Sequence, residues 1–337
     1  MIMNNTPLVS ICVPIYGVEM FIERCVRSLF EQSYPNIEYI FINDATPDNS
    51  MKVLSDVICN YPNRQSQVKI INLEENHGLA YVRNKAVRNA NGEFILHVDS
   101  DDYIEFDTVE RCIKKQIETD SDIVTFNYNY CRKTGILEYK FPVFNSAFDR
   151  TLALLSRSIA ICVWAAMYRK KLYDNVDAIV TDGVNYSEDY NITPILSYNS
   201  KKVIHINKAL YNYNVANENS YTYHFQEKNK RQLWKTFEKL TSFFCDKNPL
   251  YIDAIEKSKL FSIVDCLLIC NEKNNHDEFI DFLLIKLDEI NKKYWRYLPL
   301  RKYLFLRAYR TKTYSILSKK IKFIYHKYRH RFKKDHM

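Results

Sequence analysis

Three aspartates gather directly after a β-rich run in the first third of the chain. Asp99, Asp101 and Asp102 follow residues 93–98, Glu-Phe-Ile-Leu-His-Val. The Asp-x-Asp spacing lets two carboxylates of one turn converge on a hard divalent cation, because Mg²⁺ and Mn²⁺ prefer oxygen ligands and keep positions open for substrate phosphates. Three carboxylates at one strand end also repel one another unless a cation is present. The turn is therefore a predicted site for Mn²⁺ or Mg²⁺, and the alternative is a solvated turn that caps the next helix.

A second segment, residues 76–84, has the residue types of a phosphate-binding turn. Gly78 permits a tight turn, and Arg83 lies one turn into the helix that is expected to follow. The N-terminus of a helix attracts anions, and an arginine there can bind phosphate oxygens through two donors. On its own, Arg83 is an ordinary surface residue. Beside an acidic metal turn, it becomes a predicted contact of a diphosphate.

The elements that must position these residues alternate between strand and helix patterns over the first 130 residues. Short β-rich runs lie at residues 8–15, 37–42, 68–73, 93–98 and 122–127. Helical stretches, with apolar residues at i, i+3 and i+4, lie at residues 21–30, 79–90 and 108–117. This alternation predicts an α/β fold with a mostly parallel sheet flanked by helices on both faces. In such sheets ligands bind beyond the carboxyl ends of the strands, which is where the acidic turn stands.

The rest of the chain is organised differently. Residues 128–223 mix strand-like pieces with a helix near 150–158, and from about residue 225 onward the pattern is helical. The longest nearly apolar stretch, 158–168, is too short to span a bilayer, which takes about 20 residues, and it is predicted to lie in the core. No Gly/Ser-rich linker or internal repeat divides the chain. We therefore expect a domain boundary at 224/225 that is not marked by a linker.

The formal charge of +8 at pH 7 hides an uneven distribution. Residues 291–337 hold 16 of the 48 Lys and Arg residues but one of the 40 Asp and Glu residues, so the rest of the chain is mildly acidic. A tail that interleaves bases with Tyr, Trp, Phe and Leu is typical of helices that lie in an anionic membrane interface. A solvated or self-packed helical appendage is the alternative. Nucleic acid is disfavoured as a partner because no recognised nucleic-acid-binding motif accompanies the positive charge.

The composition excludes several other classes of protein. Five glycines in 337 residues rule out a Gly-rich or collagen-like chain, and the lack of a GxGxxG motif disfavours a dehydrogenase. The nine cysteines are odd in number and include no CxxC pair, so we expect reduced thiols in a cytosolic compartment. The first residues lack the basic start and apolar core of a signal peptide, which also leads us to expect a cytoplasmic location.

Four ordered motifs together resemble one known family. They are residues 13–16 (Val-Pro-Ile-Tyr), 43–48 (Asn-Asp-Ala-Thr-Pro-Asp), 76–84 (Asn-His-Gly-Leu-Ala-Tyr-Val-Arg-Asn) and 99–102 (Asp-Ser-Asp-Asp). In this order and at these separations they resemble a family 2 glycosyltransferase with a GT-A fold. Residues 163–172, 186–189 and 210–213 are similar to the acceptor-side segments of bacterial polysaccharide-building members. The resemblance covers roughly residues 8–223.

The resemblance implies roles for the residues on the donor side. Pro14, Tyr16 and Asp44 would hold the nucleotide base and ribose, with Asp44 facing a uracil. Arg83 would lie near the nucleoside diphosphate, and Asp102 would contact the sugar. The resemblance therefore implies that the donor is a nucleoside diphosphate sugar, which we expect to be a UDP-sugar.

The resemblance also implies a metal site and a catalytic base. Asp99 and Asp101 match the metal-binding Asp-x-Asp motif, with Asp101 as the direct ligand of Mn²⁺ or Mg²⁺ and Asp99 as a second ligand that also contacts the donor. Asp189 matches the catalytic base, and Glu188 stands beside it in the same catalytic pair. The alternative for this pair is two acids in the first turn of a helix, stabilised by the helix dipole.

Such a reaction suits these residue types. The departing nucleoside diphosphate needs its charge stabilised, which a divalent cation and Arg83 can do. A carboxylate with an ordinary pKa of about 4 is a weak base, but it is adequate when the transition state is oxocarbenium-like and the proton leaves late. With Asp189 on the face opposite the leaving group, transfer would be a single displacement with inversion.

We therefore expect a metal-dependent, inverting glycosyltransferase that moves a hexosyl or N-acetylhexosaminyl group to a hydroxyl of a glycan or lipid-linked glycan in surface polysaccharide synthesis. Residues 1–224 would form the GT-A catalytic domain, with a nucleotide-sugar half (1–107) and an acceptor half (108–224). Residues 225–290 would form a helical extension, and residues 291–337 a basic amphipathic tail at the inner face of the cell membrane. The rival functions are a sugar-nucleotide nucleotidyltransferase and a non-enzymatic membrane- or nucleic-acid-binding protein.

Overall fold

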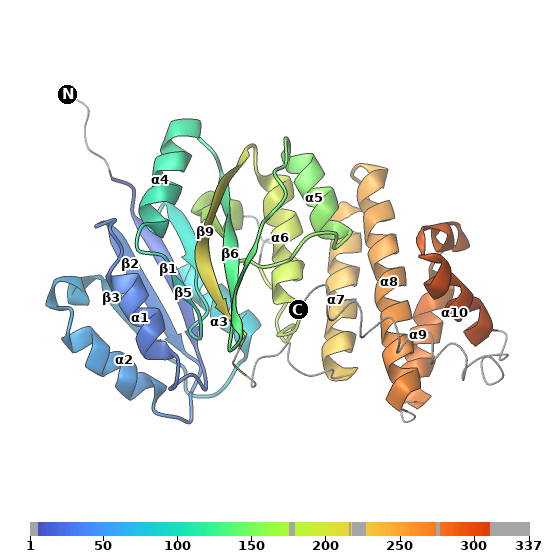
Figure 1. Cartoon of the computed structure of the whole chain (residues 1–337), viewed down its shortest axis with the longest axis horizontal. Helices are drawn as coiled ribbons and strands as arrows, with labels where there is room; N and C mark the ends of the chain where they lie inside the picture. The colour runs from blue at the N-terminus through green and yellow to red at the C-terminus, as the bar shows by residue number, and fades with distance from the viewer. Residues whose placement is uncertain (1–5, 175–178, 216, 218–226, 274–276, 311–337) are drawn as a thin grey trace. The chain divides into compact units, whose positions relative to one another are not determined.

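The chain forms two compact units, residues 1–252 and 253–337. The structure is a computed structural model that describes residues 6–174, 179–215, 217, 227–273 and 277–310. Within these residues, the first unit is built around one nine-stranded sheet with helices packed on it (Figure 1). The described part of the second unit is helical.

The bounds of the described elements are as follows. The strands are β1 (Val9–Ile15), β2 (Ile37–Asn43), β3 (Val68–Asn72), β4 (Phe94–His97), β5 (Tyr103–Ile104), β6 (Ile123–Arg132), β7 (Gly135–Tyr139), β8 (Ala166–Arg169) and β9 (Val203–Asn214). The α-helices are α1 (Ile22–Phe30), α2 (Ser50–Cys59), α3 (Leu79–Asn89), α4 (Thr108–Thr119), α5 (Ala147–Leu155), α6 (Glu188–Asn199), α7 (Glu227–Phe244), α8 (Pro249–Lys273), α9 (Asp277–Glu289) and α10 (Leu300–Arg310). Short 3-10 helices are η1 (Pro62–Gln67), η2 (Lys170–Tyr173) and η4 (Lys292–Tyr297).

The predicted parallel part of the sheet is confirmed. Strands β3, β2, β1 and β4 lie side by side in that order and run parallel, with Val9 of β1 opposite Ile37 on one side and Phe94 on the other. The five predicted strands all occur with the expected starts to within one residue, although β6 continues to Arg132. Because these strands are parallel, β1, β2 and β4 end at the same edge of the sheet.

The other part of the sheet is mixed rather than parallel. Strand β8 is antiparallel to both β4 and β6, whereas β9 is parallel to β6 and antiparallel to β5. Strand β7 forms a hairpin with the end of β6. The predicted core segment at residues 158–168 is confirmed in its larger part, since residues 162–168 are all buried and lead into β8.

Alternation along β1 explains why helices cover both faces. Ile11, Val13 and Ile15 are fully buried in one core with the apolar side chains of α1, α2 and α4. Helix α3 packs on β1 and β2 through side chains outside that core, which places it on the opposite face. The predicted helices on both faces are therefore confirmed, and α3 delivers its first turn to the edge where β1 and β2 end.

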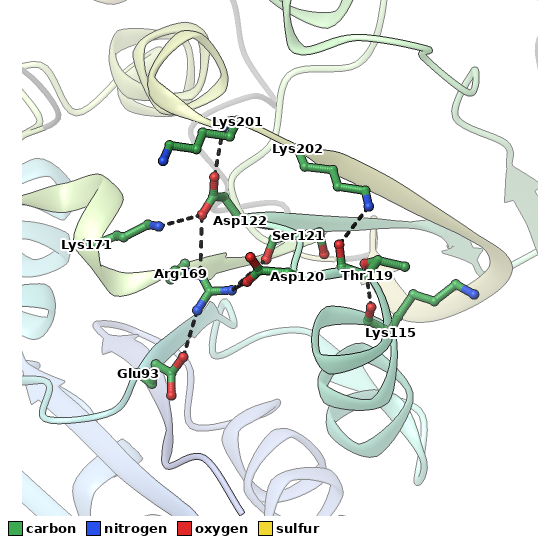
Figure 2. A network of polar contacts seen from close by, with 10 residues as sticks. All are labelled: Glu93, Lys115, Thr119, Asp120, Ser121, Asp122, Arg169, Lys171, Lys201 and Lys202. Atoms are coloured by element: carbon green, nitrogen blue, oxygen red, sulfur yellow. Dashed lines mark hydrogen bonds and ion pairs between the residues drawn. The ribbon is translucent and has the colours of Figure 1, made fainter.

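A polar network holds the two parts of the sheet together where β4, β6 and β9 begin (Figure 2). Arg169, at the end of β8, lies 2.8 Å from Glu93 Oε1, and its Nε is 3.2 Å from Asp122 Oδ1. The other carboxylate oxygen of Asp122 accepts a 2.8 Å hydrogen bond from the backbone N–H of Lys201. Partial burial opposes the charge of Asp122, but the N–H of Lys201 and the ammonium of Lys171 lower its pKa. This network lies at the edge away from the carboxyl ends of β1 and β4.

The second unit is a packed helical body in its described part. Tyr294 and Leu306 are buried, and the Tyr294 hydroxyl donates a hydrogen bond to Asp253 on α8. The Lys257 ammonium of the same helix lies 4.0 Å from the centre of the Tyr297 ring. The first part of the predicted basic tail therefore packs on α8, while residues 311–337 lie outside the described residues.

The division between the units falls after Ile252, which places α7 in the first unit rather than in a separate extension. The boundary predicted at 224/225 lies outside the described residues. Over the parts of the chain that the structure describes, no helix combines the length and the hydrophobicity needed to cross a bilayer.

Candidate active site

A large cleft opens beyond the carboxyl ends of β1, β2 and β4. Its volume is ≈ 930 Å³. Seven of the residues predicted from the sequence line it: Pro14, Tyr16, Asp44, Asp99, Asp101, Glu188 and Asp189. Two predicted residues, Arg83 and Asp102, are buried and are not among the residues that line the cleft.

One end of the cleft is formed by the loops after β1 and β2. Tyr16 is 51% exposed and its ring is accessible from the cleft. Asp44 is buried, and its two carboxylate oxygens accept 2.8 Å hydrogen bonds from the backbone N–H groups of His77 and Gly78. Asp44 therefore fixes the turn that precedes α3. Its role as a uracil contact stays a prediction.

Gly78 is required by the geometry of that turn. Its φ is +85°, and a Cβ at this position would lie 2.1 Å from the Asn185 side-chain amide nitrogen. Asn185 Oδ1 in turn accepts a 3.0 Å hydrogen bond from the backbone N–H of Ala80 in the first turn of α3. The start of α3 and the segment before α6 are thereby held against each other, which brings their charged residues together.

Arg83 lies between the acidic turn and the acidic pair. Its Nη2 is 3.0 Å from Asp99 Oδ1, 3.4 Å from Glu188 Oε1 and 3.7 Å from Asp189 Oδ1. The contact with Glu188 has hydrogen-bond geometry, whereas the N–H groups do not point at Asp99 Oδ1, which accepts no hydrogen bond despite the short distance. The Arg83 side chain is 2% exposed, so one buried guanidinium faces three carboxylates.

Burial and charge shift the pKa values in this cluster. Burial opposes the charge of Arg83, but Asp99, Asp189 and Glu188 outweigh it and raise the arginine's pKa. Burial is also the main cause that raises the pKa of Glu188 and of Asp189, and the neighbouring carboxylates add to it, while Arg83 opposes the rise in both. The pair thus binds protons more tightly than exposed carboxylates do.

Helix α7 fixes the segment that carries the acidic pair. Glu188 and Asp189 form the first turn of α6, and Ser187 before them has a left-handed backbone with φ of 68°. Gln232 Oε1 accepts a 2.8 Å hydrogen bond from the N–H of Tyr186, and the Thr236 hydroxyl lies 3.2 Å from that of Ser187. Sequence reasoning missed these α7 contacts because it placed α7 outside the catalytic domain.

The acidic turn after β4 divides its three side chains between the cleft and the sheet. Asp101 lines the cleft, and its Oδ2 accepts a 2.8 Å hydrogen bond from Asn217. Asp102 turns toward β9, where its oxygens accept 2.7 Å hydrogen bonds from the Tyr211 hydroxyl and from the N–H of Asn214. In this structure Asp102 therefore fixes β9, and its predicted contact with the sugar stays a prediction.

The chemistry of the turn fits a divalent cation. Burial, and then the charge of Asp99, raise the pKa of Asp101 to about 6. Asp99 Oδ1 is buried and accepts no hydrogen bond. Among the described residues no group of three His, Cys, Asp or Glu side chains is placed to hold a metal by itself. Mg²⁺ usually takes one or two carboxylates and completes its shell with waters and substrate phosphates, so Asp99 and Asp101 suffice on the protein side.

Aromatic residues in and beside the mixed part of the sheet also line the cleft. Tyr128, Tyr130, Trp164 and Tyr213 all contribute to it. The Trp164 ring stacks on that of Tyr213 with 5.5 Å between centroids and meets the Tyr128 ring edge-on at 4.7 Å. These packed rings form a largely apolar part of the cleft lining.

Comparisons with known proteins agree on family and fold. Residues 10–177 match the family described as Glycosyl transferase family 2. The chain is 30% identical over 224 residues to "Uncharacterized glycosyltransferase EpsJ" of Bacillus subtilis, covering 64% of this chain and 63% of that protein. It is 30% identical over 213 residues to "Hyaluronan synthase" of Pasteurella multocida, covering 62% of this chain and 20% of that protein. The matched parts thus span less than two thirds of these relatives.

Solved structures confirm the predicted GT-A-type fold. The structure of S. aureus TarS residues 1–349 in complex with UDP-GlcNAc superimposes with a TM-score of 0.73 at 19% identity, covering 91% of this chain and 88% of that one. A mannosyltransferase from Pyrobaculum calidifontis, in complex with GDP-Man and Mn²⁺, gives a TM-score of 0.54 at 17% identity, covering 90% and 86%. At these identities the likeness concerns the fold.

Replacing Arg83 with Met should destabilise the protein by about 3–5 kcal/mol at pH 7, because it leaves buried carboxylates without their cation. The pKa values of Glu188 and Asp189 are higher in the folded state than in the unfolded state. At a pH between the unfolded-state and folded-state pKa of either group, the folded protein therefore binds more protons than the unfolded chain. Stability due to these groups therefore rises as the pH falls. The deficit of Arg83→Met relative to wild type should shrink when urea unfolding is repeated at pH 5.

Arg83→Lys is the control, since it keeps the positive charge in a side chain of similar length. It should recover much of the lost free energy of unfolding at pH 7. An equal deficit of Arg83→Met at pH 5 and pH 7 would mean that lost packing, rather than unbalanced charge, is the cause.

Proposed function

Because the chain belongs to glycosyl transferase family 2, we propose that it transfers a sugar from a nucleoside diphosphate donor to a hydroxyl group of a glycan. The donor in this proposal is a UDP-sugar carrying a hexosyl or N-acetylhexosaminyl group. The acceptor is a growing or lipid-linked glycan in surface polysaccharide synthesis. Transfer inverts the configuration at the anomeric carbon.

One observation carries the proposal: the two acidic groups share a single cleft and a single arginine. Asp99 and Asp101 stand after β4, and Glu188 and Asp189 begin α6, yet both groups line the same cleft. Arg83 contacts a member of each. A single displacement needs both a leaving diphosphate and an attacking hydroxyl at one sugar ring, so two acidic groups in one cleft suit the two roles.

Asp189 is the proposed base. Its raised pKa makes its carboxylate a stronger proton acceptor than an exposed aspartate. Arg83 opposes that rise and so favours the ionised form that a base needs. Glu188 accepts the hydrogen bond of Arg83 Nη2 and thereby holds the guanidinium beside the base. The acceptor hydroxyl would give its proton to Asp189 as its oxygen bonds to the anomeric carbon.

Pro14, Tyr16 and Asp44 line the end of the cleft that we assign to the nucleoside. In this proposal the Tyr16 ring stacks on the base or ribose, because it is the half-exposed aromatic surface at that end. Asp99 and Asp101 would hold Mn²⁺ or Mg²⁺, and the cation would supply charge stabilisation to the diphosphate leaving group. Arg83 supports the same site by balancing the charge of Asp99.

Asp189→Asn should lower kcat about 10²–10⁴-fold, the range that a positioned general base contributes, while UDP binding stays near the wild-type value. Asp101→Asn should weaken UDP binding only when Mn²⁺ is present. The measurement is UDP release from a panel of nucleotide sugars with glycan acceptors, in Mn²⁺ or in EDTA, together with calorimetric binding of UDP.

Glu23→Gln serves as the matched control. Glu23 is an exposed acid paired with Arg27 on α1, so this substitution removes one negative charge away from the cleft. It should leave both readouts unchanged. Full activity in Asp189→Asn would remove Asp189 as the base. Failure of the wild type to bind any nucleoside diphosphate with Mn²⁺ would end the transferase proposal.

We further propose that the protein works at the cytoplasmic face of a bacterial membrane and touches anionic lipid through its second unit. A groove of ≈ 760 Å³ in that unit is lined by Lys292, Arg296 and Arg307 together with apolar and aromatic side chains. Leu300, which lines the groove, is 70% exposed, and Leu304 on the same helix is 51% exposed. Bases next to exposed apolar side chains suit a lipid interface, where each base contributes about 1 kcal/mol.

Replacing Lys292, Arg296 and Arg307 together with Gln should weaken binding of the full chain to vesicles containing phosphatidylglycerol at least tenfold, since about 3 kcal/mol of attraction is removed. Co-sedimentation with phosphatidylglycerol vesicles and with neutral phosphatidylcholine vesicles measures this. The control replaces three exposed lysines of the first unit with Gln: Lys52, Lys69 and Lys114. An equal loss in both triple variants would mean that net charge alone drives binding.

A further inference from the structure

The end of helix α5 holds an arginine where the backbone favours glycine. Arg157 has φ of +54°. The N–H of Ser158 bonds to the carbonyl of Ala153 at 3.0 Å, and the N–H of Arg157 bonds to the carbonyl of Leu154 at 3.0 Å. These two bonds make a complete Schellman motif with Arg157 at its left-handed position. A side chain at this position strains the backbone, and such strain concentrates at functional sites.

The Arg157 side chain is exposed and lines the cleft described above. Its guanidinium carbon lies 5.8 Å from the centre of the Tyr190 ring, and Tyr190 directly follows the proposed base Asp189. The Tyr190 hydroxyl donates a 2.6 Å hydrogen bond to the carbonyl of Leu155, which fixes the end of α5 against α6. Arg157 therefore lines the same cleft as Asp189 and lies near the residue that follows it.

The charges around the cleft make this arginine distinctive. Five carboxylates line it, and among the described lining residues Arg157 is the one Lys or Arg. Arg83 is buried and committed to three carboxylates. The planar fork of an exposed guanidinium matches a carboxylate or a phosphate group through two parallel hydrogen bonds. The same cleft is lined by the partly exposed rings of Tyr130 and Tyr213, which offer flat apolar surfaces to a sugar ring.

We propose that Arg157 is the anion-binding residue of the acceptor subsite, so that the preferred acceptor is a glycan whose reacting end carries a carboxylate or phosphate. This inference rests on the proposed function, since it assigns one side of the cleft to an acceptor. The strained backbone directs the guanidinium toward the anion, and the rings of Tyr130 and Tyr213 support the sugar ring that carries it.

The test measures three probes by NMR titration of the full chain in the presence of UDP and Mg²⁺. Methyl β-glucoside is neutral, methyl β-glucuronide carries a carboxylate, and methyl β-glucoside 6-phosphate carries a phosphate. Wild type should bind at least one anionic probe about tenfold or more tightly than the neutral one, as expected for a charge-assisted pair. The two anionic arms distinguish an acidic sugar from a phosphorylated one.

Arg157→Gly and Arg157→Gln should abolish this preference and leave the affinity for the neutral probe unchanged. Arg157→Gly should also raise Tm by about 2–4 °C, because glycine relieves the left-handed strain. A more stable variant that loses the preference cannot be dismissed as misfolded. The control is Lys133→Gln, which removes an exposed charge in the turn between β6 and β7 and should keep the preference.

Equal binding of neutral and anionic probes by wild type would overturn the inference, as would a preference that survives in Arg157→Gly. Weakened UDP binding in both Arg157 variants would overturn it too, because it would assign the arginine to the donor. A wild type that prefers the anionic probes but releases UDP from no nucleotide sugar would defeat the proposed function and leave the anion site standing.

Discussion

The rest of the site depends on the contact between one buried guanidinium and three carboxylates. Arg83 lies within 3.0–3.7 Å of Asp99, Glu188 and Asp189 in a setting where burial penalises every charge. A lone buried ion would shift its pKa and lose its charge. Here the arginine stays charged and holds back the rise in the pKa of both acids of α6. One cation for three acids leaves the cluster short of positive charge, which suits a site that takes up a divalent metal.

The fold brings this cluster together from distant parts of the chain. The parallel strands deliver the loops after β1, β2 and β4 to one edge, and α3 carries Arg83 to the same edge. Asn185 joins the start of α3 to the segment before α6, at a turn that only Gly78 accommodates. Tyr211 of β9 meets the N–H of Asp99 and the carboxylate of Asp102, so the mixed part of the sheet fixes the acidic turn. Both parts of the sheet thus fix the positions of the charged residues in the cluster.

Much of this could be predicted from the sequence, and the failures have physical causes. Parallel strands and amphipathic helices leave periodic patterns, which predicted β1, β2, β3, β4 and β6 and the helices on both faces. Short motifs predicted seven of the residues that line the cleft. Strands β8 and β9 were not predicted. β8 is only four residues long, and β9 is partly exposed without a strict alternation of buried and exposed side chains. The hydrogen bonds that hold the site in place also could not be predicted, because each is a tertiary contact that leaves no local sequence pattern; they involve Asn185, Tyr211, Gln232 and Thr236. The orientation of Asp102 toward the sheet could not be predicted either, because it depends on contacts with β9.

The central claim is that Arg83 balances the acidic pair while the acidic turn is left for a metal and a nucleotide. A crystal structure of the full chain with UDP and Mn²⁺ tests it most directly. The account predicts Mn²⁺ on Asp101 between the protein and the diphosphate, the uridine beside Tyr16, and Arg83 still paired with Glu188 and Asp189. A nucleotide bound outside this cleft, Mn²⁺ away from Asp101, or an Arg83 that has lost its contacts with Glu188 and Asp189 would contradict it.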